Sequence, residues 1–425
     1  MAHPKLLSLI LAGGKGERLF PLTAMRSKPA VPFGGRYRIV DFVLSNMINS
    51  NILSNYLMVQ YKSQSLIEHI RKNWVLSPIM RNQFVAVVPP QMRKGPAWFQ
   101  GTADAVYQNA NLIVDNNPEL VIIFGADHIY RMDVRQMIDF HLERGADVTV
   151  ATRPVPVEEA SAFGVMHVDD GHRITAFKEK PRKPPHMPGD PTRSLVSMGN
   201  YIFSRDVLLE SLARAESRKQ DDFGKHIIPD LVDSGKVFAY DFESNRVPGL
   251  KPYEEPGYWR DVGTIKAFYD AHMDSLGEKP RFDLNNPDWP IFTGTDTGLS
   301  SARIFKGTIQ NSLVSEGTQI LGGKIKDSII RSGVTVEPGA VIDGCVLMDG
   351  VVVKRGARLC RVIVDKNNVI EEKTEIGFDP EQDRFLCHID PSGIAVIPRG
   401  GKTKMRRTTR PRTTRPMTSK PRKKK

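Results

Sequence analysis

The stretch LILAGGKGERLFPLTAMRSK, residues 9–28, decides how this chain folds. An apolar run typical of a strand ends at three glycines within residues 13–16, and two spaced cations, Arg18 and Lys28, follow it. Glycines leave backbone N–H groups open to an anion because they carry no Cβ atom, and nearby cations can neutralise the bound charge. The stretch therefore predicts a strand that ends in a phosphate-binding loop.

Two common phosphate loops do not fit this stretch. A P-loop requires Gly-x4-Gly-Lys-Ser/Thr, but Lys15 is followed by Gly16, so no hydroxyl is placed for magnesium. The dinucleotide fingerprint Gly-x-Gly-x-x-Gly fails because Leu19 stands where its third glycine belongs. A plain strand-to-helix turn is the alternative interpretation, and the two spaced cations argue against it.

Apolar strand-like runs alternate with helical patterns over the first two thirds of the chain. We expect strands at residues 6–11, 56–60, 84–88, 120–124, 147–151 and 197–203. We expect helices at residues 41–49, 64–72, 103–115, 134–145 and 206–215. This alternation predicts an α/β domain with a mostly parallel, doubly wound, Rossmann-like sheet that binds ligands at the carboxyl ends of its strands.

A different fold is expected after residues 278–300, a stretch rich in Pro, Gly and Asn that we interpret as a linker. Over residues 301–400, aliphatic residues recur every six positions. They are Val341, Leu347, Val353 and Leu359, then, after a frame shift near residue 360, Val364, Ile370 and Ile376, with Ile330, Val336 and Ile342 in an earlier frame. A hexapeptide period is typical of a parallel β-helix, whereas a β-sandwich would show strict alternation and hairpin turns. The period therefore predicts a β-helix.

Charge and cysteine content exclude several classes of protein. The formal net charge of +12 lies within the last residues, because 402–425 hold twelve Lys and Arg and no acid. We expect residues 401–425 to form a disordered basic tail, with at most non-specific contact to nucleic acid. The three cysteines form no C-x-x-C pair, which argues against a disulfide framework or zinc site and favours a reducing compartment. With no signal peptide and no run of ~20 apolar residues, we expect a cytoplasmic protein that spans no membrane.

Two aspartates are candidate metal ligands. Asp127, in FGADHIYRMD (124–133), follows a strand that we expect to be buried. Asp261, in GYWRDVGT (257–264), stands two residues before a glycine that lets the backbone approach closely. Magnesium prefers one or two carboxylates together with phosphate oxygens, so the pair could hold it between two phosphoryl groups. A lone aspartate is more often a helix cap or turn residue, and the pair is more persuasive than either member.

Two further motifs carry side chains suited to ligands. FKEKP (177–181) places Glu179, which can accept hydrogen bonds from sugar hydroxyls, beside Lys180, which can meet a sugar phosphate. A solvated charged edge is the alternative role for this motif. PAWFQGTADAV (96–106) places two aromatic residues before a predicted helix, Trp98 and Phe99. An aromatic ring can stack on a nucleobase, but core packing is its commoner fate.

Ten motifs, in order along the chain, resemble those of the bacterial glucose-1-phosphate adenylyltransferases (ADP-glucose pyrophosphorylases), within the sugar-phosphate nucleotidyltransferases. They include LAGGKGERLFPLT, SKPAVPFGG, FVLSN, GTADAV, GADHIY, FKEKP and YWRDVGT, and the match runs from about residue 5 to residue 390. The first motif is shared across the nucleotidyltransferases, whereas SKPAVPFGG with FVLSN and YWRDVGT is specific to the adenylyl branch. The resemblance implies a catalytic domain at 1–277 and a left-handed parallel β-helix of hexapeptide repeats at 301–400, for assembly and regulation.

The resemblance also implies an activity, which is transfer of AMP from ATP to glucose 1-phosphate with release of pyrophosphate, the committed step of glycogen synthesis. It implies Mg²⁺ as cofactor, a sugar phosphate or other metabolite as allosteric effector, and a homotetramer. The implied catalytic residues are Asp127, Arg18 and Lys180, and the implied metal ligands are Asp127 and Asp261. The implied nucleotide-binding residues are Leu11, Ala12, Gly13, Gly14, Gly16, Arg18, Gln91, Phe99, Gly101 and Thr102. Those implied for glucose 1-phosphate are Gly164, Glu179, Lys180 and Ser197, and those for allosteric activation are Lys28, Gln60 and Trp98.

Three positions depart from the family pattern. Phe99 stands where Tyr is usual, Ala126 where many relatives have Gly, and His226 where an acid is common. None of these departures removes a charged catalytic group. Three alternatives stay open: the same chemistry with UTP or GTP, a non-catalytic regulatory subunit of the same fold, and a hexapeptide-repeat acyltransferase. The last would require a histidine in the repeats, and residues 301–376 contain none.

Overall fold

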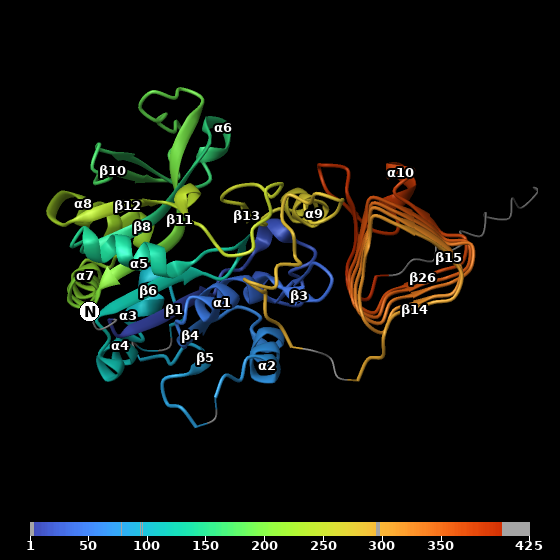
Figure 1. The fold of residues 1–425 in the computed structure, drawn as a ribbon, viewed down its shortest axis with the longest axis horizontal. Coiled ribbons are helices and arrows are strands. Elements are labelled where there is room, and N and C mark those ends of the chain that lie inside the picture. The colour runs from blue at the N-terminus through green and yellow to red at the C-terminus, as the bar shows by residue number, and fades with distance from the viewer. Residues whose placement is uncertain (1–3, 78, 94, 96, 295–297, 402–425) are drawn as a thin grey trace, which may run out of the picture.

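The computed structural model describes residues 4–77, 79–93, 95, 97–294 and 298–401. It consists of an α/β body followed by a β-helix (Figure 1). The basic tail expected at residues 401–425 lies outside the described residues, apart from Gly401. No helix within the described ranges is both long and apolar enough to cross a membrane.

The described residues of the body form a nine-stranded mixed sheet. Its strands are β1 (Leu6–Ala12), β4 (Ser54–Val59), β5 (Phe84–Val88), β6 (Leu120–Gly125), β8 (Val148–Pro156), β9 (Gly164–Val168), β10 (Ile174–Glu179), β11 (Arg193–Ser204) and β12 (Val237–Asp241). The main path runs β10-β9-β11-β6-β1-β4-β5, while β8 pairs with β11 and with β12. All six predicted strands are present, with ends that differ by a few residues.

The prediction of a mostly parallel sheet is correct for only part of it. Strands β6, β1, β4 and β5 are parallel neighbours, as are β8 and β12. Strand β11, however, runs antiparallel to β6, β8 and β9, and β10 runs antiparallel to β9. Antiparallel neighbours need no long crossover helix, and the chain between β8 and β9 holds only the short helix α6 (Val157–Ala160) among its helices and strands.

Helices cover both faces of this sheet, because its central strands are apolar on both sides. In β1, Leu7 and Leu9 enter one core cluster and Ile10 enters the other, and β6 divides its side chains in the same way. The helices are α1 (Ile39–Asn49), α2 (Gln64–Asn73), α3 (Thr102–Tyr107), α4 (Ala110–Asn116), α5 (Val134–Glu143), α7 (Arg205–Ser217), α8 (Ile228–Ser234) and α9 (Ile265–Met273). The single helix predicted at residues 103–115 is divided into α3 and α4, and the other four predicted helices are confirmed.

The C-terminal part is a three-sided parallel β-helix (Figure 1). Its strands are β14 (Arg303–Ile304), β15 (Gly307–Gln310), β16 (Leu313–Val314), β17 (Gln319–Ile320), β18 (Gly323–Lys326), β19 (Ile329–Ile330), β20 (Thr335–Val336), β21 (Val341–Asp343), β22 (Val346–Leu347), β23 (Val352–Val353), β24 (Arg358–Cys360), β25 (Val362–Val364), β26 (Val369–Ile370), β27 (Glu375–Ile376), β28 (His388–Ile389) and β29 (Ala395–Ile397). They form three sheets, β14-β17-β20-β23-β26, β15-β18-β21-β24-β27 and β16-β19-β22-β25-β29-β28. A short helix, α10 (Pro380–Asp383), lies in the chain between β27 and β28.

The register of the β-helix explains its hexapeptide period. Ile320 pairs with Val336, Val336 with Val353 and Val353 with Ile370, so the coil spacing is 16 residues near the start of the β-helix and 17 residues after that. A 17-residue coil contains two steps of six residues and one of five. The five-residue step between Ile342 and Leu347 corrects the predicted frame: Ile342 is fully buried inside the prism, whereas Val341 is only half-buried.

Buried arginines join the β-helix to the body. The Arg26 Nη2 atom lies 2.7 and 2.6 Å from the two carboxylate oxygens of Asp365, which directly follows β25, and both side chains are buried. Arg331 in turn donates from Nη1 to the backbone carbonyls of Phe33 and Gly34. These contacts fasten the segment around β2 (Pro32–Phe33) and β3 (Tyr37–Arg38) to the β-helix.

The segment predicted as a linker packs on the body. Its described residues, 278–294 and 298–300, contain no helix or strand. Phe282, Trp289 and Ile291 are nevertheless buried. Burial of three large apolar side chains holds this stretch against the body instead of leaving it free in solvent.

We predict that Asp365→Ala destabilises the protein by about 3–5 kcal/mol, because it leaves the buried Arg26 cation without its partner. The free energy of unfolding, measured by chemical denaturation, tests this value. The double variant Arg26→Met/Asp365→Leu is the control and should recover most of the loss, because it removes both charges. A single variant as stable as the wild type would contradict the prediction.

Candidate active site

A two-stranded ribbon brings the two predicted metal ligands together. Strand β7 (His128–Tyr130) pairs antiparallel with β13 (Trp259–Asp261), and His128 stands opposite Asp261. Asp127 directly precedes β7 at the carboxyl end of β6. Ligand atoms of Asp127, His128 and Asp261 all lie within 4.8 Å of one another. The ribbon therefore gathers donors suited to a metal ion beside the end of the central sheet.

Lys28 occupies the space between the two aspartates. Its Nζ atom lies 2.6 Å from Asp261 Oδ1 and 3.0 Å from Asp127 Oδ2, and its side chain is 6% exposed. These contacts join Lys28 to the candidate metal ligands. The effector role that the family resemblance implies for Lys28 stays a prediction.

The charges of this cluster stabilise one another. Burial disfavours the ionised form of Asp127 and of Asp261, but the Lys28 ammonium and His128 outweigh it and lower the pKa of both carboxyls. Burial likewise lowers the pKa of Lys28, yet the two carboxylates raise it above its ordinary value overall. Both acids and the lysine are therefore charged at neutral pH.

The glycine loop lies next to this cluster and leaves room for a ligand. Apart from its two chain neighbours, no described residue has an atom within 4 Å of the position that a Cβ atom of Gly14 would take. Gly16 has a φ of +64°, which favours glycine, and its carbonyl accepts a hydrogen bond from Thr23 Oγ1 at 2.9 Å. Leu11 pairs with Gly125 of the neighbouring strand, so the loop begins beside the segment that carries Asp127.

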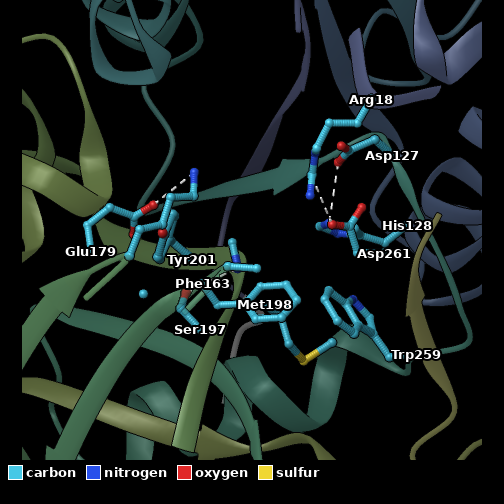
Figure 2. A pocket seen from close by; sticks show the side chains of 14 residues that line it. Arg18, Asp127, His128, Phe163, Glu179, Ser197, Met198, Tyr201, Trp259 and Asp261 are labelled. Carbon is cyan, nitrogen blue, oxygen red and sulfur yellow. Dashed lines mark hydrogen bonds and ion pairs between the residues drawn. The ribbon is translucent and has the colours of Figure 1, made fainter. Parts of the chain in front are cut away.

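Arg18, after the loop, points toward the cluster (Figure 2). Its Nη2 atom lies 3.4 Å from Asp261 Oδ2, and its side chain is 64% exposed. Gly263 makes this approach possible, because a Cβ atom there would lie 2.8 Å from Arg18 Nη2. An exposed guanidinium at this position can bind a phosphate group.

A cavity of about 510 Å³ separates the acidic cluster from a second group of polar residues. Figure 2 shows Arg18, Asp127 and Asp261 on one side, with Glu179 and Ser197 across the cavity. All four residues predicted to bind glucose 1-phosphate line this cavity, namely Gly164, Glu179, Lys180 and Ser197. The structure thus assembles the predicted sugar residues and the predicted metal ligands around one space.

Local contacts explain the shape of the sugar side of the cavity. The Lys180 Nζ atom lies 3.3 Å from Glu179 Oε1. Gly164 leaves space for this pair and for Phe177, since a Cβ atom would lie 2.8 Å from Glu179 Oε2 and 2.4 Å from the ring. Lys180 has a φ of +45°, held by a backbone hydrogen bond of 2.9 Å from its N–H to the carbonyl of Phe163. The backbone turns there toward the cavity mouth.

Phe99 is not free to stack on a base. Its side chain is 9% exposed and belongs to the core cluster that includes Leu9 and Met58. Gln60 binds its backbone on both sides: the Phe99 N–H donates to Gln60 Oε1 at 2.7 Å, and Gln60 Nε2 donates to the Phe99 carbonyl at 3.1 Å. Trp98, in contrast, is 50% exposed, and it is the aromatic side chain of this segment with a free surface.

The other predicted nucleotide residues lie outside the cavity. Gly101 is required for close packing, since a Cβ atom there would lie 2.3 Å from the carbonyl oxygen of Asp221. Thr102 Oγ1 donates to Asp222 and accepts a hydrogen bond from a backbone N–H, which fastens the start of α3. Gln91 is exposed, and its Nε2 atom donates to the carbonyl of Pro89 at 2.8 Å.

The structure adds aromatic residues to the site that the sequence reasoning missed. The rings of His128 and Trp259 are tilted by 52° with centroids 4.7 Å apart, and Phe163 meets Trp259 edge-on at 5.5 Å. Tyr201 also lines the cavity. His128 follows Asp127 in the sequence, Phe163 precedes Gly164, and Trp259 lies two residues before Asp261. Closeness in the sequence to the predicted site residues could therefore have identified these three aromatic residues.

Two of the departures from the family pattern have structural roles of their own. Ala126 is fully buried, and its N–H donates to the carbonyl of Leu11 at 3.0 Å. His226 Nδ1 accepts hydrogen bonds of 3.2 Å from the backbone N–H groups of Asp221 and Asp222. Neither side chain lines the cavity.

Comparison with known proteins agrees with the two parts of the fold. A nucleotidyl transferase family model matches residues 7–278, and a GlmU-like, C-terminal hexapeptide model matches residues 299–397. A glucose-1-phosphate adenylyltransferase from Thermodesulfovibrio yellowstonii is 60% identical, over 94% of this chain and 97% of the relative. Proteins of the same name from an Anaeromyxobacter species and from Corynebacterium jeikeium are 49% and 46% identical, each over 93% of this chain and 98% of the relative. The chain therefore belongs to the nucleotidyl transferase family, in its glucose-1-phosphate adenylyltransferase branch.

Proposed function

We propose that this protein transfers AMP from ATP to glucose 1-phosphate and so forms ADP-glucose and pyrophosphate, as the committed step of glycogen synthesis in the cytoplasm. One observation carries the proposal: Arg18, which follows the glycine loop, lines a single cavity together with Asp127 and Asp261 and with the pair Glu179 and Lys180. The first group suits a nucleoside triphosphate, and the second suits a sugar phosphate. The names of the relatives support the same substrates.

We further propose Mg²⁺ as the cofactor, held by Asp127 and Asp261. The two carboxylates fit a cation, because both already contact the Lys28 ammonium and their oxygens lie within 4.8 Å of each other. When bound, the ion would supply charge neutralisation at the reacting phosphates.

The proposed reaction needs positioning and charge neutralisation more than proton transfer. A phosphate oxygen of glucose 1-phosphate is already an anion, so it attacks the α-phosphorus of ATP without a general base. A new P–O bond forms there while the bond to the β-phosphate oxygen breaks, and pyrophosphate leaves with that electron pair. Arg18 and Lys28 offset the negative charge on the triphosphate, while Glu179 and Lys180 orient the sugar phosphate in line.

We assign the remaining predicted residues to supporting roles. Residues 11–16 receive the triphosphate, with the exposed Trp98, rather than Phe99, offering a surface for the base. Gly101 and Thr102 are proposed to support the nucleotide site by fixing the start of α3, and Gln91 by contact with the nucleotide from the protein surface. Gln60 is proposed to relay activation by an effector, a sugar phosphate or another metabolite, because it contacts Phe99 and lies beside Gly13.

We also propose a separate role for each of the two domains. Residues 1–277 are proposed as the catalytic domain, and residues 301–400 as the part that serves assembly into a homotetramer and regulation. The buried contacts of Arg26 and Arg331 support a direct influence of the β-helix on the segment that carries Lys28.

The direct test of this function is pyrophosphate release from ATP and glucose 1-phosphate, with and without Mg²⁺. We expect release with ATP that depends on both Mg²⁺ and the sugar phosphate. The same assay with UTP and GTP tests the choice of nucleotide, and faster turnover with either would overturn the assignment of ATP. Candidate metabolites added to the assay would identify the effector.

We predict that Asp127→Asn lowers kcat by at least ~10²-fold, the scale of losing one strong electrostatic stabiliser. Steady-state kinetics measures the loss, and circular dichroism checks that the fold is intact. Asp206→Asn serves as a control, because this aspartate pairs with Arg205 on the exposed surface of α7. Near-normal turnover of the Asp127 variant would exclude that residue as a metal ligand.

Lys180→Ala should chiefly raise the KM for glucose 1-phosphate, because it removes the cation nearest the sugar side of the cavity. The matched control is Lys178→Ala, since Lys178 lies on the same strand β10, is exposed and does not line the cavity. If the KM values of the two variants are equal, Lys180 does not bind the sugar phosphate.

Lys28→Gln distinguishes a role in the active site from a role in effector binding. If Lys28 acts on the phosphates, the variant should lose about 10²-fold in kcat even without an effector. If Lys28 instead binds the effector, basal turnover should stay normal and only activation should disappear. Turnover measured with and without each candidate metabolite separates the two outcomes.

A further inference from the structure

We infer that Arg260 is the positioning residue of Asp261: its guanidinium fastens strand β13 to helix α9 and so holds one carboxylate of the phosphoryl-transfer site in place. Arg260 does not line the cavity, whereas its neighbours Trp259 and Asp261 do. The inference rests on the proposed function, because it concerns the same site and the same reaction.

Strand β13 needs an anchor beyond its backbone. It contains three residues, and in the part of the chain that the structure describes it pairs with β7 alone. A two-stranded ribbon is marginally stable by itself. Side chains alternate along a strand, so Trp259 and Asp261 face the cavity while Arg260 points to the opposite side. Residues that bind Arg260 therefore hold strand β13 on the side that faces away from the cavity.

Two carboxylates bind Arg260 from that side. Its Nη1 and Nη2 atoms lie 2.9 and 2.6 Å from the two oxygens of Glu255, and its Nε atom lies 3.2 Å from Asp274 Oδ2. The guanidinium also lies over the ring of Tyr258, 4.2 Å from its centroid. A planar guanidinium that is paired through both of its edges and stacked on a ring has little freedom to move. These contacts tie strand β13 to Glu255, to Tyr258 and to Asp274 at the end of α9.

Asp274 connects this anchor to the rest of the fold. It is the C-cap residue of α9, where an acidic side chain is disfavoured by the helix macrodipole. Hydrogen bonds from Arg260 and from Tyr258 Oη, at 3.1 Å, offset that cost. Helix α9 lies between the body and the β-helix (Figure 1), and its Tyr269 Oη donates to the carbonyl of Gly344 at 2.7 Å. Arg260 thus links the strand that carries Asp261 to helix α9, which itself contacts the β-helix.

Arg281 provides a matched comparison within the same charge cluster. Its guanidinium pairs with Glu255 at 2.5 Å and with Asp274 at 3.5 Å, yet it lies outside β13 and its side chain is 61% exposed. Removal of Arg281 therefore takes one positive charge from the same two carboxylates without releasing the strand. A variant of Arg260 that behaves differently must act through the position of β13.

The effect should be confined to one side of the cavity. Asp261 moves with β13, whereas Gly164, Glu179 and Ser197 are held by the main sheet, on β9, β10 and β11. Release of Arg260 should therefore disturb the metal ligands and the turnover number, and leave binding of the sugar phosphate unchanged. A general loss of stability would not lower the turnover number while leaving sugar-phosphate binding unchanged.

The test compares Arg260→Gln, Arg260→Lys and Arg281→Gln in the full-length protein. Pyrophosphate release gives kcat and the KM for glucose 1-phosphate, and electron paramagnetic resonance gives the dissociation constant of Mn²⁺ in the presence of a non-hydrolysable ATP analogue. We expect Arg260→Gln to lower kcat by roughly 10- to 10²-fold and to weaken Mn²⁺ binding several-fold, because a misplacement of about 1 Å can cost that much. Its KM for glucose 1-phosphate should stay within about twofold of the wild type.

Arg281→Gln should stay close to the wild type in kcat, in the KM for glucose 1-phosphate and in the dissociation constant of Mn²⁺. Arg260→Lys should be intermediate, because lysine keeps one ion pair but lacks the two-pronged guanidinium that binds both carboxylates. Equal behaviour of the Arg260→Gln and Arg281→Gln variants would overturn the inference. If Arg260→Gln does not fold, Arg260→Lys carries the same comparison. A wild type that releases no pyrophosphate would refute the proposed function, whereas Mn²⁺ binding would still compare the variants and decide the role of Arg260.

Discussion

The structure depends on one electrostatic constraint, the repulsion between two carboxylates that must lie close together. Asp127 and Asp261 come from segments far apart in the chain, and each would disfavour the charge of the other in a partly buried site. The Lys28 ammonium lies between them and relieves this repulsion. The phosphate loop, the end of β6 and the ribbon β7–β13 are consequently held in one arrangement, with Arg18 at its open side.

The β-helix is fixed to the segment that follows the glycine loop. The segment after the glycine loop carries Lys28, and it is fixed from behind by the buried pair of Arg26 and Asp365. Arg331 holds the next turn of the same segment through its carbonyl groups. A regular prism of 16- and 17-residue coils offers a rigid surface for such contacts, since each coil stacks directly on the one before it. The β-helix thus supports the site from outside it.

Much of the fold could be predicted because it follows from local patterns. The continuous apolar run of β6 predicts a strand buried on both faces, and the hexapeptide period predicts the β-helix. The errors arose where packing between distant segments decides the outcome. Strand β11 runs antiparallel to β6, which no pattern within β11 encodes. The sequence left two roles open for Phe99, base stacking and the commoner core packing, and its burial in the core cluster that includes Leu9 and Met58 agrees with the second.

The sequence by itself determined the elements and the chemistry available to them: a glycine turn after a strand, two aspartates in short motifs, and an acid beside a base in FKEKP. These are properties of neighbouring residues, and local sterics and hydration are sufficient to specify them. Only the tertiary structure decided which side chains meet. Lys28 and Asp261 are 233 positions apart, and their pairing depends on the packing of the whole body rather than on any local preference. For that reason only the tertiary structure placed the Lys28 ammonium between the two carboxylates of the candidate active site.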